Sequence, residues 1–369
     1  MKFSRTLLTG ACAALVSLGV ALPGAAQAQT KLRIQSAFPA QGLYQLAAED
    51  FAERVNTLSG GRLKVELLPS GSVVPAFEVL DAVNKKVIDG GYTAPAYWLG
   101  KNKAAALFGP APGGPYGMDV IDYLGWIYDG GGLQLYRDFY QNELKSNVVV
   151  FPLTASDRQA LGWFKKPVAN WADLKGRKCR QTGITAEVFS KSGMATVNMP
   201  GGEIVPAGER GVIDCAEFVG AAEDSLIGFQ TVWKNFYPQS MHEPATVVEL
   251  LINGDVWKGL APDLQAIVQA ATVESTLRSI YVRNKKDGQA MQDMRTKHGV
   301  TIHRTPDDIV VKTLESWDQI SEAEAGKNPF FKKVLESQKA YAGQVVPTRR
   351  TTTVPYNLAA DHYWPIKKP

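Results

Sequence analysis

The chain has 369 residues, a formal net charge of +4 and 45% hydrophobic residues. This length can bury a sizeable core and is usually divided between two domains. A charge so close to zero gives no indication of nucleic-acid binding, and beyond the N-terminal segment no apolar run reaches the roughly 18 residues that a membrane span needs.

The first 28 residues have the pattern of a secretory signal peptide. Lys2 and Arg5 give a positive start, residues 7–22 are apolar, and Ala26-Gln27-Ala28 is a cleavage signal with small residues at its ends. Cleavage after Ala28 removes 28 of the 369 residues and lowers the formal charge from +4 to +2, because Lys2 and Arg5 are lost. We therefore expect a mature protein in the periplasm.

Strand and helix patterns alternate over the first part of the mature chain. Alternating apolar residues indicate strands, and apolar residues at intervals of three and four indicate helices. The expected strands are residues 31–38, 63–68 and 88–93, and the expected helices between them are residues 43–58 and 77–87. This order of elements predicts a sheet with parallel strands.

Residues 94–118 interrupt this alternation with a long segment that is rich in proline, glycine and aromatic residues. A long loop between regular elements is often a binding loop. We favour ligand binding for Tyr97, whose hydroxyl suits a polar ligand. For Trp98 and Phe108, ligand binding and simple packing on the lobe agree equally well with the sequence.

Residues 171–218 are expected to form a second strand–helix–strand–helix–strand unit. A fixed cation, Arg180, ends its first strand, and a carboxylate, Glu217, ends its third. Ligands of open parallel sheets bind outside the carboxyl ends of the strands, so Arg180 and Glu217 are candidates to face one small ligand. Cys179 and Cys215 lie just before them, on strands that can be neighbours. An oxidising compartment permits a disulfide there, but the alternation of side chains could also point the two thiols to opposite faces.

The rest of the chain is expected to contain a crossing strand, a returning strand, three helices and an irregular tail. The strands are residues 148–153 and 246–252, and the helices are residues 262–297 and two that begin at Pro306 and Pro329. The tail from Val345 shows no periodic pattern. We expect it to wrap over the surface, anchored by Tyr363 and Trp364.

Motifs of common enzyme classes do not occur in the sequence. It lacks GxSxG, HExxH, P-loop and CxxC patterns, and its four histidines are not spaced as metal ligands. What remains is one arginine and a set of oxygen ligands. From residue type alone, Arg180 is most simply part of an ordinary ion pair, and Glu217 and Glu243 are partners of basic residues. Gln159 could merely satisfy backbone groups.

Several short segments carry a family resemblance. They are Asp173-Leu174-Lys175-Gly176-Arg177-Lys178-Cys179-Arg180, Glu209-Arg210-Gly211-Val212-Ile213-Asp214-Cys215-Ala216-Glu217 and Trp257-Lys258-Gly259-Leu260. Through them nearly all of the mature chain resembles the periplasmic solute-binding proteins of tripartite ATP-independent periplasmic (TRAP) transporters. More narrowly it looks like the 2-oxo-acid and lactate-binding subgroup, whose marks are Gln159 before Gly162-Trp163-Phe164, Tyr97-Trp98, Glu217-Phe218 and Glu243-Pro244.

The resemblance implies an α/β fold with two hinge-connected lobes and mixed, mainly parallel sheets, as in periplasmic binding proteins. The first lobe is expected to hold residues 29–152 and about 245–305, and the second residues 153–244. Residues 306–369 are expected to form C-terminal helices and a tail that pack across the lobes.

The resemblance also implies a role for each matching residue. Arg180 pairs with the substrate carboxylate, Tyr97 donates its hydroxyl from the first lobe, and Trp98 lies beside it in the substrate site. The cation ligands are the side chains of Gln159, Glu217 and Glu243 and the backbone carbonyl of Phe218, and Gln159 and Phe218 also contact the substrate. Oxygen ligands of this kind suit Ca²⁺ or Na⁺ rather than zinc.

We therefore expect a protein that captures a 2-oxo or 2-hydroxy monocarboxylate with a bound cation and delivers it to the TRAP membrane permease without chemical change. The alternative is a periplasmic metal-dependent enzyme of the lyase type that acts on an oxo acid. A homodimer through the helix of residues 328–343 is a further hypothesis. The apolar face of that helix is more simply explained by packing on its own lobe.

Overall fold

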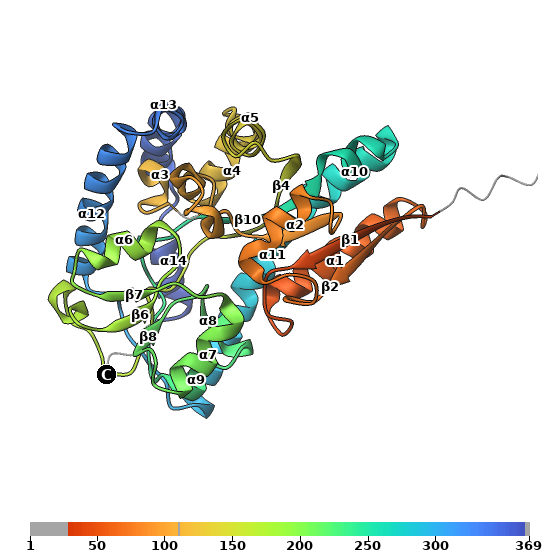
Figure 1. Cartoon of the computed structure of the whole chain (residues 1–369). Coiled ribbons are helices and arrows are strands. Elements are labelled where there is room, and N and C mark those ends of the chain that lie inside the picture. The colour runs from red at the N-terminus through yellow and green to blue at the C-terminus, as the bar shows by residue number, and fades with distance from the viewer. Residues whose placement is uncertain (1–28, 110, 366–369) are drawn as a thin grey trace, which may run out of the picture.

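The computed structural model describes residues 29–109 and 111–365, so the expected signal peptide lies outside the described residues. Two mixed β-sheets organise the chain, and Figure 1 shows β1 and β2 on one side of the molecule and β6, β7 and β8 on the other. We call the parts around the two sheets the first and the second lobe. Among the described residues, no helix combines the length and the apolar character that crossing a membrane requires.

The first sheet has the strand order β2-β1-β3-β10-β4. Its strands are β1 (Thr30–Ser36), β2 (Leu63–Leu68), β3 (Gly90–Thr93), β4 (Val148–Ser156) and β10 (Thr246–Asn253). β1 pairs in parallel with β2 and β3, whereas β10 is antiparallel to both β3 and β4. The register of β10 on β4 shifts between Val248 and Glu249. Almost every residue of β4 and β10 is buried, as expected for strands that are covered on both faces.

The second sheet has the order β11-β9-β5-β8-β6-β7. Its strands are β5 (Gly162–Phe164), β6 (Lys178–Arg180), β7 (Ala195–Val197), β8 (Cys215–Ala216), β9 (Asn235–Tyr237) and β11 (Thr301–Ile302). β6, β7 and β8 are parallel, with β6 in the middle, which is the neighbour relation that the sequence suggested. The expected first lobe extended to about residue 305, but β11 pairs with β9 in the second sheet.

Helices cover both sheets and join them. They are α1 (Leu43–Leu58), α2 (Val79–Asn84), α3 (Gly114–Gly117), α4 (Val120–Tyr128), α5 (Gly132–Asp138), α6 (Ile184–Ser190), α7 (Gly201–Glu209), α8 (Ala221–Leu226), α9 (Phe229–Val232), α10 (Gly254–Gly259), α11 (Pro262–Lys297), α12 (Asp307–Ala325), α13 (Pro329–Thr352) and α14 (Tyr356–Tyr363). Shorter helical segments are η1 (Ala76–Glu78), η2 (Pro95–Trp98), η3 (Lys103–Leu107), η4 (Phe139–Glu143) and η5 (Trp171–Leu174). α11 begins at Pro262 and ends at Lys297, as predicted, and contacts elements of both lobes.

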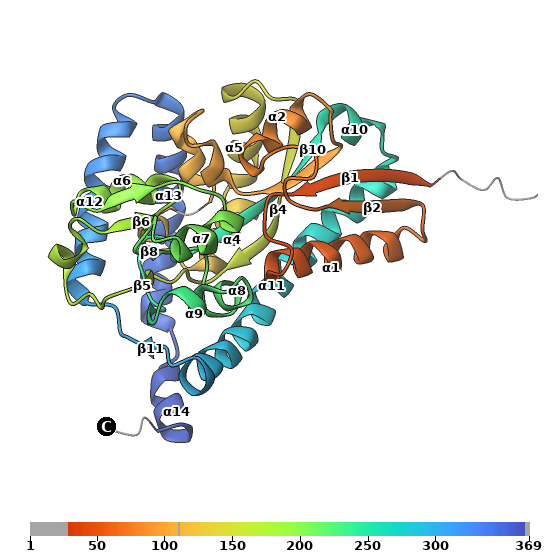
Figure 2. The same ribbon diagram turned by 60° about the horizontal axis from the view of Figure 1, so that its bottom comes forward.

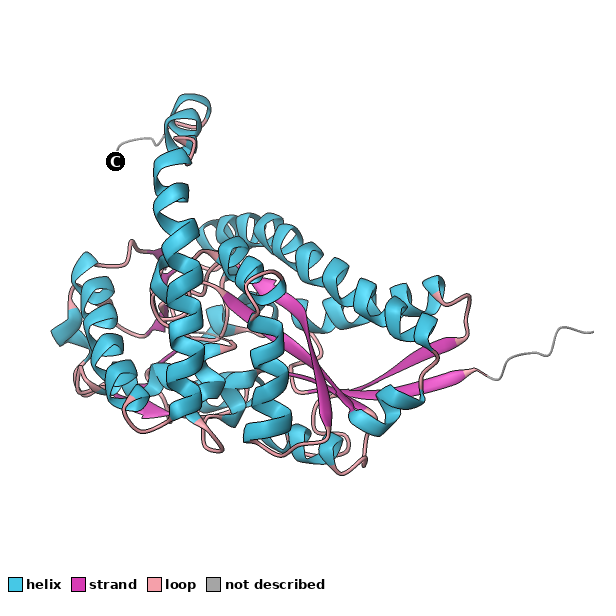
Figure 3. Cartoon of the chain, turned by 90° about the horizontal axis from the view of Figure 1, so that it is seen from above, coloured by secondary structure: helices cyan, strands magenta, loops and turns pink. Residues whose placement is uncertain are grey.

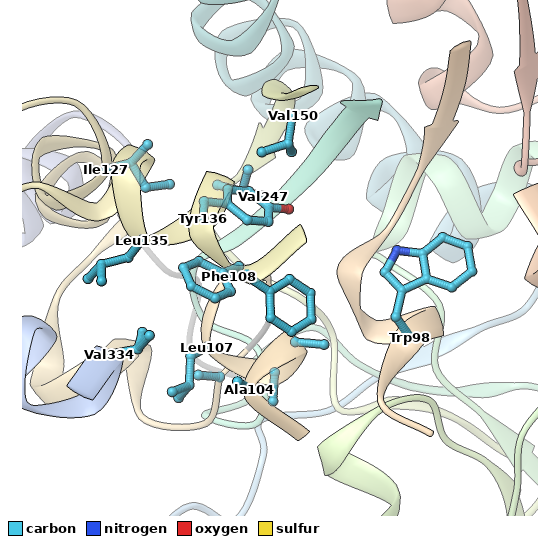
Figure 4. Packing of buried hydrophobic residues seen from close by; sticks show 14 of the residues in the cluster. Trp98, Ala104, Leu107, Phe108, Ile127, Leu135, Tyr136, Val150, Val247 and Val334 are labelled. Atoms are coloured by element: carbon cyan, nitrogen blue, oxygen red, sulfur yellow. The ribbon is translucent and has the colours of Figure 1, made fainter. Parts of the chain in front are cut away.

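Two large hydrophobic clusters hold the molecule together. One joins the aromatic residues of the 98–140 region to α13, with Phe108 stacked on Tyr136 at a ring distance of 4.6 Å (Figure 4). The other continues from Leu32 and Val55 in the first lobe to Trp163 and Trp233 in the second. Because the second cluster contains side chains of both lobes, the structure is a closed arrangement.

Local glycine and proline geometry accounts for two differences from the predicted elements. The sequence past Glu217 predicts one helix that ends at about Gln230, but the structure has two, α8 and α9, because Gly228 adopts a left-handed φ of 100° between them. Pro306 is the residue before α12 rather than its first residue, so α12 begins at Asp307.

The predicted irregular tail is wrong in two respects. α13 continues through Pro347 to Thr352, and α14 follows it (Figure 3). Tyr363 and Trp364 are not anchors, since they are 72% and 83% exposed. Figure 2 shows α14 standing off from the rest of the molecule, in agreement with the exposure of these side chains in the described part of the chain.

Candidate functional site

A small cavity of about 40 Å³ lies between the lobes, next to the carboxyl ends of β6 and β8. Its wall combines aromatic rings with oxygen and nitrogen groups from both lobes. The residues that line it are Phe38, Tyr44, Ala94, Ala96, Tyr97, Gln159, Arg180, Thr182, Glu217, Phe218, Glu243, Thr246, Val247 and Val248. The structure therefore brings together six of the predicted site residues, which are Tyr97, Gln159, Arg180, Glu217, Phe218 and Glu243.

Arg180 and Glu217 form a buried ion pair at the centre of this cavity. The Arg180 Nη1 donates to the Glu217 carboxylate at 2.6 Å and to the Glu217 carbonyl at 2.9 Å. Its Nε donates to the carbonyl of Met199 at 3.2 Å, and the guanidinium lies 5.6 Å from the ring centre of Phe218. Two of its three nitrogens, Nε and Nη1, thus donate hydrogen bonds to the protein. Nη2 has no hydrogen-bond acceptor among the described residues and can donate to a ligand.

A disulfide lies directly behind this ion pair. Cys179 and Cys215 are opposite each other on the neighbouring strands β6 and β8, and their Cα atoms are 4.5 Å apart. The two thiols therefore point to the same face and are bonded, which settles the alternative that the sequence left open. The bond fixes the strand ends that carry Arg180 and Glu217.

Gln159 and Glu243 bring two more oxygen groups to the cavity. The Gln159 backbone N–H donates to the Glu243 carbonyl at 3.0 Å, which holds the two segments side by side. The Gln159 side-chain oxygen is buried, and no hydrogen-bond partner for it occurs among the described residues. A buried oxygen of this kind is costly unless a donor or a cation meets it.

Burial and like charge make Glu243 costly to ionise. Burial raises the pKa of Glu243 well above its usual value, and the neighbouring Glu217 raises it further, while Arg180 lowers it. For Glu217 burial also raises the pKa, against the opposing effect of its ion pair with Arg180. A cation between these carboxylates would lower the cost of keeping both ionised.

The donor set fits a hard cation. It consists of two carboxylates and an amide oxygen. A separate metal site built from three or more His, Cys, Asp and Glu side chains does not occur among the described residues. Oxygen-only ligands are those preferred by Ca²⁺ and by other hard cations.

Tyr97 lies on the first-lobe side of the cavity, where η2 places it. Its ring packs on Phe77 at 4.6 Å. Burial raises the pKa of Tyr97 to about 12, so its hydroxyl keeps its proton and can donate to a ligand oxygen.

Trp98 is not in the cavity, contrary to the prediction for the substrate site. The indole is 1% exposed, and its Nε1 donates to the carboxylate of Glu249 at 3.0 Å. Figure 4 shows Trp98 among the residues of the first hydrophobic cluster, as it does Phe108. Along η2, adjacent side chains point in different directions, so Tyr97 and Trp98 could not both face the ligand.

His242 lies next to the site, although it does not line the cavity. Its side chain is fully buried beside Glu243, and its Nδ1 lies 2.5 Å from the Ser240 hydroxyl. Burial and the charge of Arg180 lower the pKa of His242 to about 3, so the ring is neutral. Its position directly before Glu243 is the one feature of the sequence that indicates this placement.

Two α/β lobes that enclose a small cavity with charged side chains in its wall are typical of proteins that close around a solute. The chain belongs to the bacterial extracellular solute-binding proteins, family 7, and the match spans residues 35–323. A monocarboxylate 2-oxoacid-binding periplasmic protein of Nostoc sp. is 32% identical over 98% of this chain and 99% of its own length.

Solved structures agree with this assignment. A TRAP periplasmic solute-binding protein of Pseudoalteromonas atlantica, with bound sodium and pyruvate, is 26% identical with a TM-score of 0.83. The alignment covers 90% of this chain and 99% of that one. A TRAP transporter solute-binding protein of Bordetella bronchiseptica is also 26% identical with a TM-score of 0.83, over 91% of this chain and 97% of its own. It is a mixed-occupancy dimer with copurified calcium and picolinate in one active site.

Proposed function

We propose that the protein captures a small 2-oxo or 2-hydroxy monocarboxylate in the periplasm, together with Ca²⁺ or Na⁺, and delivers it to a TRAP membrane permease. The observation that carries this proposal is the buried oxygen of Gln159, which has no hydrogen-bond partner in the described part of the chain and lies beside two carboxylates and Arg180. The relatives named above bind a pyruvate with sodium or a picolinate with calcium, and the proposal extends that chemistry to these residues.

Gln159, Glu217, Glu243 and the Phe218 carbonyl would hold the cation. The cation supplies positive charge for the ligand carboxylate and for the adjacent oxo or hydroxy oxygen. Arg180 binds the carboxylate through Nη2, in a single hydrogen bond rather than a two-pronged contact, because Nε and Nη1 are already bonded to the protein. Tyr97 donates its hydroxyl from the opposite lobe.

Charge counting separates the two cations. With Glu217 and Glu243 ionised, these two groups and Arg180 together carry −1. Ca²⁺ and one monocarboxylate bring the site to zero, whereas Na⁺ and one monocarboxylate leave it at −1. In a buried cavity the neutral combination is favoured, because an uncompensated charge there is costly.

Isothermal titration with pyruvate tests the proposal. Protein stripped of cations by a chelator in sodium-free buffer should bind pyruvate about 10- to 100-fold more weakly than protein supplied with Ca²⁺, since one charge-assisted contact contributes about 1.5–3 kcal/mol. Glu243→Gln should weaken both Ca²⁺ and pyruvate binding. Glu203→Gln, which changes an exposed glutamate of the second lobe, is the matched control. Unchanged binding by stripped wild-type protein would refute the cation assignment.

The same proposal implies that the ligand leaves unchanged. Incubation of the protein and Ca²⁺ with pyruvate and 2-oxobutyrate, followed by NMR, should show no product above the protein-free rate. Steady turnover would instead support the lyase alternative.

We also propose a homodimer that uses the end of the chain rather than residues 328–343. The apolar face predicted for that segment packs on its own lobe, since Phe330, Phe331 and Val334 are buried. The exposed apolar side chains lie further along, at Val354, Tyr356, Leu358, Tyr363 and Trp364. Native mass spectrometry should give a dimer for the whole mature chain and a monomer after truncation at residue 352. A full-length monomer at micromolar concentration would refute this.

A further inference from the structure

A carboxylate of the second lobe caps a helix of the first. α1 begins after Gly42, which has no side chain to cap it. Instead, the backbone N–H of Leu43 donates to Oε2 of Glu223 at 2.6 Å, although the two residues are 180 positions apart in the sequence. α1 packs on β2 of the first sheet, whereas Glu223 belongs to α8, which follows β8 of the second. The free N–H groups at a helix start favour an anion, so this contact joins the lobes by charge and by a hydrogen bond.

The surroundings of Glu223 are fully buried and charged. Its side chain is inaccessible to solvent, and the Nη1 of Arg283 on α11 lies 3.9 Å from Oε2. The Arg283 guanidinium lies over the ring of Tyr44 at 5.2 Å. Asp287, one turn further along α11, accepts a hydrogen bond from the Ala222 backbone at 2.8 Å. α1, α8 and α11 therefore meet at one polar junction.

Glycine is needed at position 42 because the side chain of Glu223 lies against it. A Cβ atom at this position would lie 2.0 Å from Glu223 Oε1 and 2.9 Å from its Cδ. The backbone angles of Gly42, φ −86° and ψ 169°, are ordinary for any residue. Glycine is thus not needed for the backbone conformation, and an alanine would be tolerated wherever Glu223 is absent or withdrawn.

We infer that Glu223 is a positioning residue for ligand binding. It caps α1, and through this contact it holds the lobes closed and fixes Tyr44 on the cavity wall. Tyr44 follows Leu43 directly and packs on Phe38 of its own lobe at 4.5 Å. Its ring also meets Phe218 of the second lobe edge-on at 6.3 Å. Closure and the shape of the cavity are therefore coupled through the first turn of α1. The inference rests on the proposed function where it uses pyruvate as the probe.

Substitution of Gly42 by alanine tests the inference, because a methyl group there opposes the closed arrangement alone. Gly42→Ala should raise the dissociation constant for pyruvate, measured with Ca²⁺ present, by at least about tenfold. Gly259→Ala is the matched control, since a Cβ there would meet nothing within 4 Å, and it should bind as the wild type does. Glu223→Ala should weaken binding as well. Glu223→Gln, which keeps an acceptor for the Leu43 N–H, should recover part of the loss.

Two outcomes would overturn the inference. One is wild-type affinity in Gly42→Ala, and the other is a double variant Gly42→Ala/Glu223→Ala that binds more weakly than Glu223→Ala alone. A second readout does not depend on the ligand. Amide hydrogen exchange at Leu43 should be slow in the wild type and faster in Glu223→Ala, and equal rates would also overturn the inference. If wild-type protein failed to bind pyruvate while this exchange difference was present, the proposed ligand would be wrong and the capping contact would stand.

Discussion

Glu249 is a carboxylate in the core of the first lobe, and its titration predicts how stability depends on pH. It is fully buried on β10 and accepts hydrogen bonds from Trp98 Nε1 at 3.0 Å, from the Tyr140 hydroxyl at 2.6 Å and from the Tyr136 hydroxyl. Burial raises the pKa of Glu249 from 4.5 to about 7, although these three donors lower it. The folded protein therefore binds a proton between these pH values that the unfolded chain has released.

The sign and size of the effect follow from this difference. Stability falls as the pH rises from 4.5 to about 7, because over that interval the unfolded state binds fewer protons. Each pKa unit corresponds to about 1.4 kcal/mol, so Glu249 alone lowers the free energy of unfolding by about 3 kcal/mol across the interval. Glu249→Gln removes the titration and keeps a side chain of similar shape.

Urea denaturation of the wild type and of Glu249→Gln at intervals from pH 4.5 to 8 measures this effect. The difference in unfolding free energy between the two proteins should change by about 3 kcal/mol, since the contributions of all other groups cancel. Glu66→Gln, which changes an exposed glutamate on β2, should give a difference that does not vary with pH. A constant difference for Glu249→Gln would refute the reasoning.

Three further predictions concern the cavity and its support. Arg180→Met should raise the dissociation constant for pyruvate by about 10- to 100-fold, whereas Ca²⁺ should still bind. Loss of Ca²⁺ binding in calorimetry would contradict the idea that Arg180 binds the acid and not the cation. Tyr97→Phe should weaken pyruvate binding by about tenfold with little change in melting temperature, and unchanged affinity would remove Tyr97 from the site. The double variant Cys179→Ser/Cys215→Ser lacks the disulfide that closes a loop over a sequence separation of 36 residues, so its unfolded state is less constrained. Its free energy of unfolding should fall by up to about 4 kcal/mol. Equal denaturation midpoints for the variant and the wild type would contradict this prediction.

Much of the site could be predicted because its residues lie at strand ends. Arg180 ends β6 and Glu217 follows β8, and right-handed connections allow these two strands to be neighbours, so the proximity of the two residues could be inferred. Gln159 and Glu243 come from segments far apart in the sequence, and only the family resemblance placed them together. The hydrogen bond between their backbones is a tertiary contact that no local pattern indicates.

The errors arose where local patterns do not determine packing. Trp98 shares a short helical segment with Tyr97, but the buried acceptor Glu249, 151 residues away, fixes its direction. We predicted that the aromatic residues of the tail would be buried, whereas Tyr363 and Trp364 are exposed in the described chain. The junction of Glu223, Arg283 and Gly42 joins three separate elements, and sequence spacing alone gave no indication of it.

α11 limits how the two lobes can separate. Its 36 residues form a continuous rod about 54 Å long, which packs on α1 and β4 at one part and on α8 and β11 at another (Figure 2). A rod bound to both lobes excludes free rotation about a single point, because opening must either bend the helix or slide one lobe along it. The buried side chains between residues 271 and 276 are alanine, threonine and serine, all of which are small. Opening is therefore expected either to bend α11 or to include a displacement of one lobe along it.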